Sequence, residues 1–314
     1  MVTLNFFLDQ LLGDVPGGIG RYAENLAREV IRRAPAGCEV AGLVSQIPSE
    51  EEQRLYDRFP GIAHIETSKL SRKALSKAWQ HGFLTGVFGG GLFHAPSLFA
   101  PLRDPSSGDA HQTVVTVHDT VPWRHPDTLT PNGVRWHKAQ LKRAWQYADA
   151  VVTPTHAVAE QVAELYDFGD RLRVIPGAAS PDLRVPADEA RRAEIEMRLN
   201  LPGEFILAVG TLEPRKGLDR LIRALAQPQL AGAVLVHAGP DGWGEVDLDA
   251  LCAEAGVERY RVRGLGYLTD EELAVVLDRA TVFCMPSLDE GFGLPVLEAF
   301  RAGTPVVHTD VPAL

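Results

Sequence analysis

The sequence predicts an α/β fold built as two doubly wound, parallel β-sheet domains. Three observations carry this prediction: short apolar runs alternate with amphipathic segments, the runs are apolar throughout, and one proline- and glycine-rich stretch at residues 176–186 interrupts the alternation. Strands that are apolar throughout are typical of parallel sheets covered by helices on both faces. We therefore predict an N-terminal domain at residues 1–180 and a C-terminal domain at residues 181–314.

Each short apolar run is a predicted strand. In order along the chain, these runs are Leu4–Leu8, Val40–Val44, Val114–Val117, Ala150–Val152, Val174–Ile175, Phe205–Val209, Val234–Val236, Val282–Cys284 and Pro305–Val307. Between most of them lie stretches with apolar residues at helical spacing. These predicted helices are Arg21–Arg33, Val134–Ala148, Ala157–Tyr166, Leu218–Ala226 and Glu271–Ala280.

Size and charge limit the possible functions. The chain has 314 residues, 45% of them hydrophobic, which suits two domains that each bury a core. The net charge of −10 argues against a dedicated nucleic-acid binder, because phosphate contacts need a basic face. Up to residue 180 there are 18 basic and 19 acidic residues, and beyond it 13 and 22, so a phosphate site in the second half needs local cations.

The cysteines and the N-terminus indicate a compartment. Cys38, Cys252 and Cys284 are widely spaced and match no metal-binding pattern, which favours a reducing environment. The N-terminus lacks the basic start of a signal peptide, and no run of 18 apolar residues predicts a membrane span. We therefore expect a cytoplasmic protein.

The segment from Pro286 to Val307 carries the strongest functional signal. It is predicted to form a loop and then a helix that begins near Pro295, a residue suited to a first helical turn. The amides of a glycine-containing loop at a helix N-terminus favour a bound diphosphate, here Gly291, Phe292, Gly293 and Leu294. Glu290 at the mouth of the loop is placed to hold sugar hydroxyls, and Glu298 to accept from a vicinal diol such as a ribose.

A second loop has the same strand–loop–helix arrangement. It reads Phe205-Ile-Leu-Ala-Val-Gly-Thr-Leu-Glu-Pro-Arg-Lys-Gly, with two adjacent cations before a predicted helix. Cations beside a helix start can neutralise charge that develops on a departing diphosphate.

Together these segments resemble glycosyltransferase family 4 (GT4), a family of retaining enzymes. The similarity lies in Glu-Gly-Phe-Gly-Leu-Pro-x-Leu-Glu-Ala, with seven residues between Glu290 and Glu298, and in the Arg-Lys loop. It implies a GT-B fold of two Rossmann-like domains facing a cleft, and a donor diphosphate held by Arg215 and Lys216. Many relatives have a further arginine where this chain has Thr211, so the resemblance implies that Gly210 and Thr211 contribute backbone amides.

The first domain extends the resemblance. Asp14-Val-Pro-Gly-Gly-Ile-Gly-Arg-Tyr is not a dinucleotide fingerprint, but it is similar to the GT4 glycine loop, which implies that Gly17 and Gly18 face the diphosphate. A tight structural turn is the alternative. Val117-His118-Asp119-Thr120 is similar to the family's His-Asp pair, which implies that His118 contacts the donor sugar and that Asp119 orients it or touches the acceptor.

Two other patterns have competing interpretations. Asp247-Leu-Asp249 spells the Asp-x-Asp of metal-dependent GT-A enzymes, but it precedes a predicted helix, so we interpret it as a cap and expect no metal. The stretches Lys69–His81 and Arg135–Trp145 are basic and amphipathic. They indicate either core-facing helices or peripheral contact with an anionic membrane at its inner face.

The predicted function is transfer of a hexose with retention of configuration. The nucleotide-sugar donor would sit on the C-terminal domain and the acceptor, a glycan or lipid-linked glycan, on the N-terminal domain. The Thr-Leu-Glu-Pro-Arg-Lys and Gly-Pro-Asp-Gly-Trp segments resemble those of mannosyltransferases, which implies GDP-mannose as the favoured donor, with UDP- and dTDP-sugars open. No cofactor is expected. The chain also ends soon after a predicted strand, so we expect a C-terminal truncation relative to the family. Three rivals remain: a nucleotide-sugar epimerase of the same fold, a non-catalytic nucleotide-sugar-binding protein, and a dehydrogenase, which would need the missing fingerprint.

Overall fold

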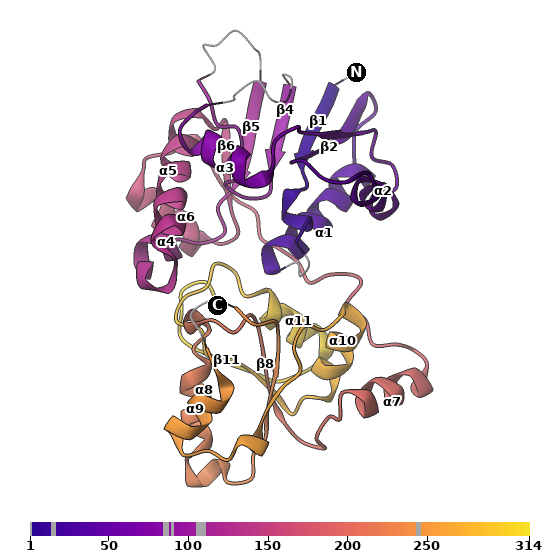
Figure 1. Ribbon diagram of the computed structural model, residues 1–314, viewed down its shortest axis with the longest axis vertical. Helices are drawn as coiled ribbons and strands as arrows, with labels where there is room; N and C mark the ends of the chain where they lie inside the picture. The colour runs from indigo at the N-terminus through magenta and orange to yellow at the C-terminus, as the bar shows by residue number, and fades with distance from the viewer. Residues whose placement is uncertain (1, 14–16, 84–87, 89–90, 105–110, 243–245) are drawn as a thin grey trace. The chain divides into compact units, whose positions relative to one another are not determined.

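The computed structural model describes residues 2–13, 17–83, 88, 91–104, 111–242 and 246–314. The chain divides into two compact units, Met1–Pro176 and Gly177–Leu314, each with its own parallel sheet (Figure 1). The boundary predicted between residues 180 and 181 lies just beyond this division.

The first unit is built on a seven-stranded sheet with strand order β3-β2-β1-β4-β5-β6-β7, and every neighbouring pair is parallel. Its strands are β1 (Val2–Phe7), β2 (Cys38–Val44), β3 (Ile65–Thr67), β4 (Gly91–Ala95), β5 (His111–Thr116), β6 (Ala150–Thr153) and β7 (Leu172–Val174). Its helices are α1 (Gly18–Arg32), α2 (Ser49–Arg58), α3 (Arg72–Gln80), α4 (Val121–Arg124), α5 (Pro131–Tyr147) and α6 (His156–Leu165).

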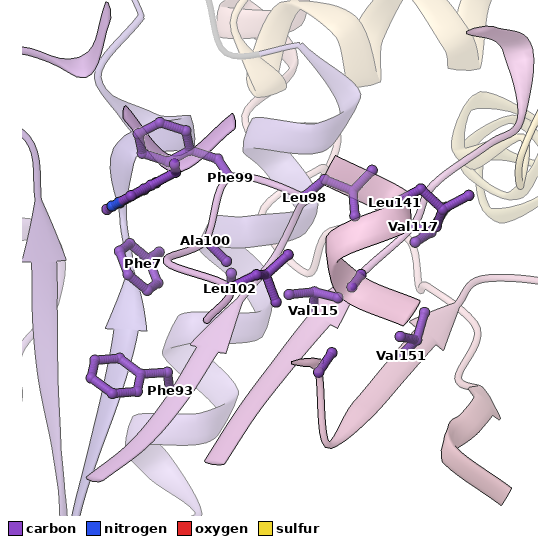
Figure 2. Packing of buried hydrophobic residues seen from close by; sticks show 14 of the residues in the cluster. Phe7, Phe93, Leu98, Phe99, Ala100, Leu102, Val115, Val117, Leu141 and Val151 are labelled. Carbon is purple, nitrogen blue, oxygen red and sulfur yellow. The ribbon is translucent and has the colours of Figure 1, made fainter. Parts of the chain in front are cut away.

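Both faces of this sheet are buried, as the apolar strands predict. Phe7 on β1 belongs to one apolar cluster, in which Val115 of β5 and Leu141 of α5 also pack (Figure 2). Its neighbours Phe6 and Leu8 belong to a second cluster with residues of α1 and α2. Because successive side chains of a strand point to opposite faces, the two clusters cover the two sides of the sheet.

The second unit has a five-stranded parallel sheet with strand order β10-β9-β8-β11-β12. Its strands are β8 (Ile206–Val209), β9 (Leu235–Ala238), β10 (Val262–Gly264), β11 (Val282–Met285) and β12 (Val306–His308). Its helices are α7 (Glu189–Arg198), α8 (Leu218–Leu225), α9 (Leu248–Ala255), α10 (Asp270–Arg279) and α11 (Leu294–Ala302). Two apolar clusters again pack around the sheet. The prediction of two parallel, doubly wound domains is confirmed.

Three strands escaped the sequence pattern. β3 reads Ile-Glu-Thr and β10 reads Val-Arg-Gly, and both lie at sheet edges, where polar side chains reach solvent. β4 lies in the middle of its sheet, but it reads Gly-Leu-Phe-His-Ala, too short an apolar run to stand out. Helices α2 and α7 were also missed, because each buries only one side chain, Leu55 or Ile195.

The amphipathic stretches place their apolar faces in the core. Leu75 and Trp79 of α3 and Leu141 of α5 are buried in the first cluster, and Trp136 packs against it. Lysines of both stretches, among them Lys73, remain exposed. Membrane contact stays a prediction that depends on these charges. Among the helices of the described residues, none is long and apolar enough to cross a bilayer.

Asp247 caps α9, as predicted. Its Oδ1 accepts from the backbone N of Asp249, 2.9 Å away, and Asp249 pairs in turn with Arg259. This Asp-x-Asp therefore has a structural use in the fold.

Candidate functional site

Two loops meet at the carboxyl edge of the second unit's sheet. They follow β8 and β11, which are adjacent parallel strands, and ligands of such sheets bind at this edge. The backbone N of Leu288 donates to the carbonyl of Arg215 at 2.8 Å, and Arg215 Nη1 donates to the carbonyl of Asp289, also at 2.8 Å. Gly217 has φ of 64°, and a Cβ there would lie 2.2 Å from the carbonyl oxygen of Pro286. Only glycine allows the loops to approach this closely.

The predicted cations and the first predicted acid form one ionic cluster. Lys216 Nζ lies 2.8 Å from Glu290 Oε1, and Arg215 Nη1 lies 3.4 Å from Glu290 Oε2. Arg215 also pairs with Glu213 at 2.6 Å. Glu290 is only 8% exposed. Burial alone would raise the pKa of Glu290, but Lys216 and Arg215 outweigh it, so the pKa lies below its ordinary value and the group is a carboxylate.

The helix after the second loop begins without a side-chain cap among the described residues. α11 starts at Leu294, so Pro295 lies in its first turn as predicted, and Gly293 precedes it with φ of 79°. The ring of Phe292 lies against Gly177, so this residue offers a ligand its backbone rather than its side chain. Glu298 lies on the buried face of α11 and is 2% exposed.

Gly210 and Thr211 lie where the first loop leaves the sheet. Gly210 has φ of 150°, and the aliphatic stem of Lys216 lies along it, with Cδ and Cε 3.4 Å from the position of a Cβ. The methyl group of Thr211 points towards the backbone of Gly242. A Cβ added to Gly242 would lie 2.6 Å from that methyl carbon. The residues predicted around the diphosphate therefore come together in this unit.

In the first unit, α1 starts at an open glycine pair. Gly17 is the N-cap and Gly18 the first helical residue; both are exposed, and a Cβ at either would meet nothing within 4 Å. Residues 14–16 of the same motif lie outside the described residues. The start of α1 thus offers backbone amides with room for a ligand to approach.

His118 and Asp119 follow β5 beside this helix. The Nε2 of His118 lies 2.7 Å from the carbonyl oxygen of Pro96, and its ring meets the ring of Tyr22 of α1 edge-on at 4.9 Å. A carbonyl only accepts, so Nε2 carries the hydrogen and Nδ1 of the neutral ring is an acceptor. Burial lowers the pKa of His118, which keeps the ring neutral. Asp119 Oδ1 accepts from the backbone N of Val121 at 3.1 Å.

These two residues line a cavity of about 330 Å³. Its wall includes Ile19, Arg72, Ser97, His118, Asp119 and Trp136. Arg72 and Trp136 come from the two amphipathic stretches, so the sequence drew attention to them for another reason. Ser97 follows β4, a strand that was not predicted. A larger cavity of about 520 Å³ between α1 and the amino ends of β1 and β2 is almost entirely apolar and contains no predicted site residue.

Comparison with known proteins identifies the family. The model described as Glycosyltransferase Family 4 matches residues 16–183, more than half of the chain, and the model described as Glycosyl transferases group 1 matches residues 192–314. The chain belongs to glycosyltransferase family 4. The relatives and family models identify this glycosyltransferase as a hexosyltransferase.

Individual relatives agree with this placement. The O-antigen chain mannosyltransferase B of Escherichia coli is 26% identical over 95% of this chain and 80% of its own length. The serotype-specific mannosyltransferase WbdA of Escherichia coli is 28% identical over 67% of this chain, which covers only 27% of that longer protein. HepE of Anabaena, solved with UDP-glucose, shares the GT-B fold, with a TM-score of 0.68, 18% identity, and coverage of 99% of this chain and 81% of its own. The roles of individual residues remain predictions.

Proposed function

We propose that this glycosyltransferase moves mannose from a nucleotide-diphosphate sugar to a glycan acceptor, with retention of configuration. The observation that carries the donor side is the ion pair between Lys216 and Glu290 at 2.8 Å. It joins a cation suited to the diphosphate with a carboxylate suited to sugar hydroxyls, at adjacent points of one sheet edge. A donor whose diphosphate lies against Lys216 would therefore present its hexose to Glu290.

The diphosphate would be held by charge and by backbone. Arg215 and Lys216 are already neutralised by Glu213 and Glu290, so a bound diphosphate would draw the cations away from these acids. The amides of Gly291–Leu294 at the start of α11 would share the new negative charge. As the bond to the sugar breaks, these groups would stabilise the negative charge on the leaving diphosphate.

Mannose is supported by relatives and not by any contact in the structure. Two relatives are mannosyltransferases, which favours GDP-mannose, whereas the UDP-glucose in HepE keeps UDP-sugars in the panel to be tested. The relatives also favour transfer over epimerisation or binding without turnover, because both are transferases by name.

The cavity beside His118 suits a sugar: the donor hexose, as predicted for His118, or the end of the acceptor, as one prediction for Asp119 has it. Its wall combines the aromatic ring of Trp136, the hydroxyl of Ser97, and two side chains that can accept hydrogen bonds, His118 and Asp119. Cavities with apolar walls and a few convergent polar groups are the usual form of small-ligand sites. In this arrangement Nδ1 of His118 would accept a hydrogen bond from a sugar hydroxyl.

The test is release of nucleoside diphosphate from GDP-mannose, UDP-glucose and dTDP-glucose, with and without glycan acceptors. We expect wild type to use at least one donor, and Lys216→Ala and Glu290→Ala to lower the rate by about a hundredfold or more. Arg223→Ala is the matched control, because Arg223 pairs with Asp219 on the exposed surface of α8, and its loss should leave the rate unchanged. Wild-type rates in both site variants would overturn the assignment, and release of an epimerised free sugar would favour the rival enzyme.

A further inference from the structure

His237 is a buried polar side chain that the proposed chemistry does not use. It lies on β9, between β8 and β10, and is 4% exposed. Its Nε2 lies 2.8 Å from the carbonyl oxygen of Gly210, in the loop after β8. Because a carbonyl can only accept, Nε2 carries a hydrogen and donates it. Burial lowers the pKa of His237, with Asp241 as the nearby charge that opposes the shift, so the ring donates in its neutral form.

The carbonyl that His237 holds belongs to a crowded backbone crossing. The amide of Gly210 donates to the carbonyl of Ala238 at 2.9 Å, and the amide of Leu212 donates to the carbonyl of Pro240 at 3.0 Å. A Cβ at Gly239 would lie 1.9 Å from the carbonyl oxygen of Gly210. The backbones of the two loops are therefore in direct contact here, and the imidazole donates to the same carbonyl from within the sheet.

Gly210 is also in contact with Lys216, the cation predicted to bind the diphosphate. The stem of Lys216 lies along Gly210, with Cδ and Cε 3.4 Å from where a Cβ would stand, and its Nζ reaches Glu290 at 2.8 Å. A shift of Gly210 would remove the surface on which the lysine stem rests. The stem of Lys216 therefore lies against the same glycine whose carbonyl accepts the hydrogen bond from His237.

We propose that His237 is a positioning residue of the donor site, fixing Gly210 so that Lys216 is held where the diphosphate binds. This inference rests on the proposed function, since it assumes that Lys216 meets a nucleoside diphosphate. A residue that only filled the core would be replaceable by leucine, whereas a residue that holds Gly210 needs a donor at the place of Nε2.

Three substitutions separate these roles. The amide nitrogen of glutamine lies about where Nε2 of histidine lies. The amide nitrogen of the shorter asparagine lies about where Nδ1 lies, too far back to reach Gly210, and leucine has no donor. We expect His237→Gln to bind GDP or UDP, whichever wild type binds, within about threefold of wild type. We expect His237→Asn and His237→Leu to weaken that binding about tenfold, the effect of losing one well-formed hydrogen bond. The donor KM should rise in parallel, with a smaller change in kcat.

Calorimetry on the full chain measures the binding, and thermal unfolding of each variant shows whether it is folded. His94→Leu is the control, because His94 is a histidine of the first unit, far along the chain from the loop, and should leave binding unchanged. In a Lys216→Ala background, His237→Leu should cause little further loss, because the two changes act through one contact. Wild-type binding by the leucine variant, no rescue by glutamine, or full additivity with Lys216→Ala would each overturn the inference. If wild type binds none of GDP, UDP or dTDP, the proposed function itself fails.

Discussion

At the scale of single residues, the charge of Glu290 determines what a diphosphate must displace when it binds. Its carboxylate pairs with both cations of the neighbouring loop, at 2.8 Å from Lys216 and 3.4 Å from Arg215. Burial would raise its pKa, but the two cations hold the pKa below its ordinary value, so the group is a carboxylate at neutral pH. A diphosphate therefore competes with a permanent carboxylate.

This competition gives a prediction for Glu290→Gln. The amide keeps the shape but not the charge, so the two cations lose their competitor, and we expect nucleoside diphosphate to bind at least as tightly as to wild type. We also expect turnover to fall about a hundredfold, because a neutral amide holds developing charge on the sugar poorly. Calorimetry and product release measure the two effects separately. Weaker binding by this variant would mean that Glu290 organises the cations instead of competing for the diphosphate.

Sequence alone predicted part of this site. Arg215, Lys216 and Glu290 stand in contiguous motifs after strands, and the resemblance of these motifs to GT4 was sufficient to propose their roles. His237 and Ser97 had no such signal, because their importance depends on which strands become neighbours. Ser97 follows β4, whose mixed composition concealed a central strand, and His237 matters only because β9 pairs with β8.

At the scale of elements, the helices differ in how they begin. A side-chain oxygen caps α3, α5, α6, α7, α9 and α10, and α10 has a full capping box formed by Thr269 and Glu272. By contrast, α1, α2, α4, α8 and α11 begin without a side-chain cap among the described residues, and α1, α8 and α11 begin after a glycine. The loops before these three helices are the ones that the family resemblance places beside the diphosphate. Leaving out a cap lowers helix stability and keeps amides available for an anion.

The start of α1 gives a test of that exchange. Gly17→Asp places a capping carboxylate in open space, since a Cβ at Gly17 meets nothing within 4 Å and φ of −69° suits any residue. We expect the variant to be stabilised by about 0.3 kcal/mol and to bind the donor at least tenfold more weakly. Gly17→Ser supplies a neutral cap as the control and should gain similar stability with a smaller loss of affinity. An unchanged donor KM in Gly17→Asp would exclude this helix start from the phosphate site.

At the scale of the whole molecule, the two sheets followed from the alternation of buried strands and amphipathic helices. What the pattern could not give was strand order, because β1 and β4, which pair in the centre of the first sheet, are separated by two strands and three helices along the chain. The cavity beside His118 depends on that order, since it gathers residues from α1, α3, α5 and the ends of β4 and β5. The motifs could therefore place the chemistry on loops but not describe the wall around it.

Buried histidines also give the first unit a pH-dependent stability. The Nε2 of His94 on β4 is buried and has no hydrogen-bond partner within the described part of the chain, and the ring lies 5.2 Å from that of Phe6. Burial lowers the pKa of His94 from 6.5 to about 4. The unfolded chain thus takes up a proton below about pH 6.5, while the folded protein does so only near pH 4. The part of the stability that depends on a neutral His94 is therefore fully present above about pH 6.5, and it is lost as the pH drops towards 4.

His94→Leu removes this one contribution and replaces the imidazole with an apolar side chain of similar size. Between pH 7 and pH 5 we expect wild type to lose about 2 kcal/mol more unfolding free energy than the variant. Urea unfolding followed by tryptophan fluorescence is suited to the measurement, because Trp79, Trp123, Trp136 and Trp145 all belong to the first unit and only Trp243 to the second. The pKa values of His118 and His237 are lowered as well, so the unfolding free energy of both proteins should still depend on pH, with a smaller slope in the variant. Equal slopes in the two proteins would show that His94 takes up its proton in the folded state as readily as in the unfolded chain.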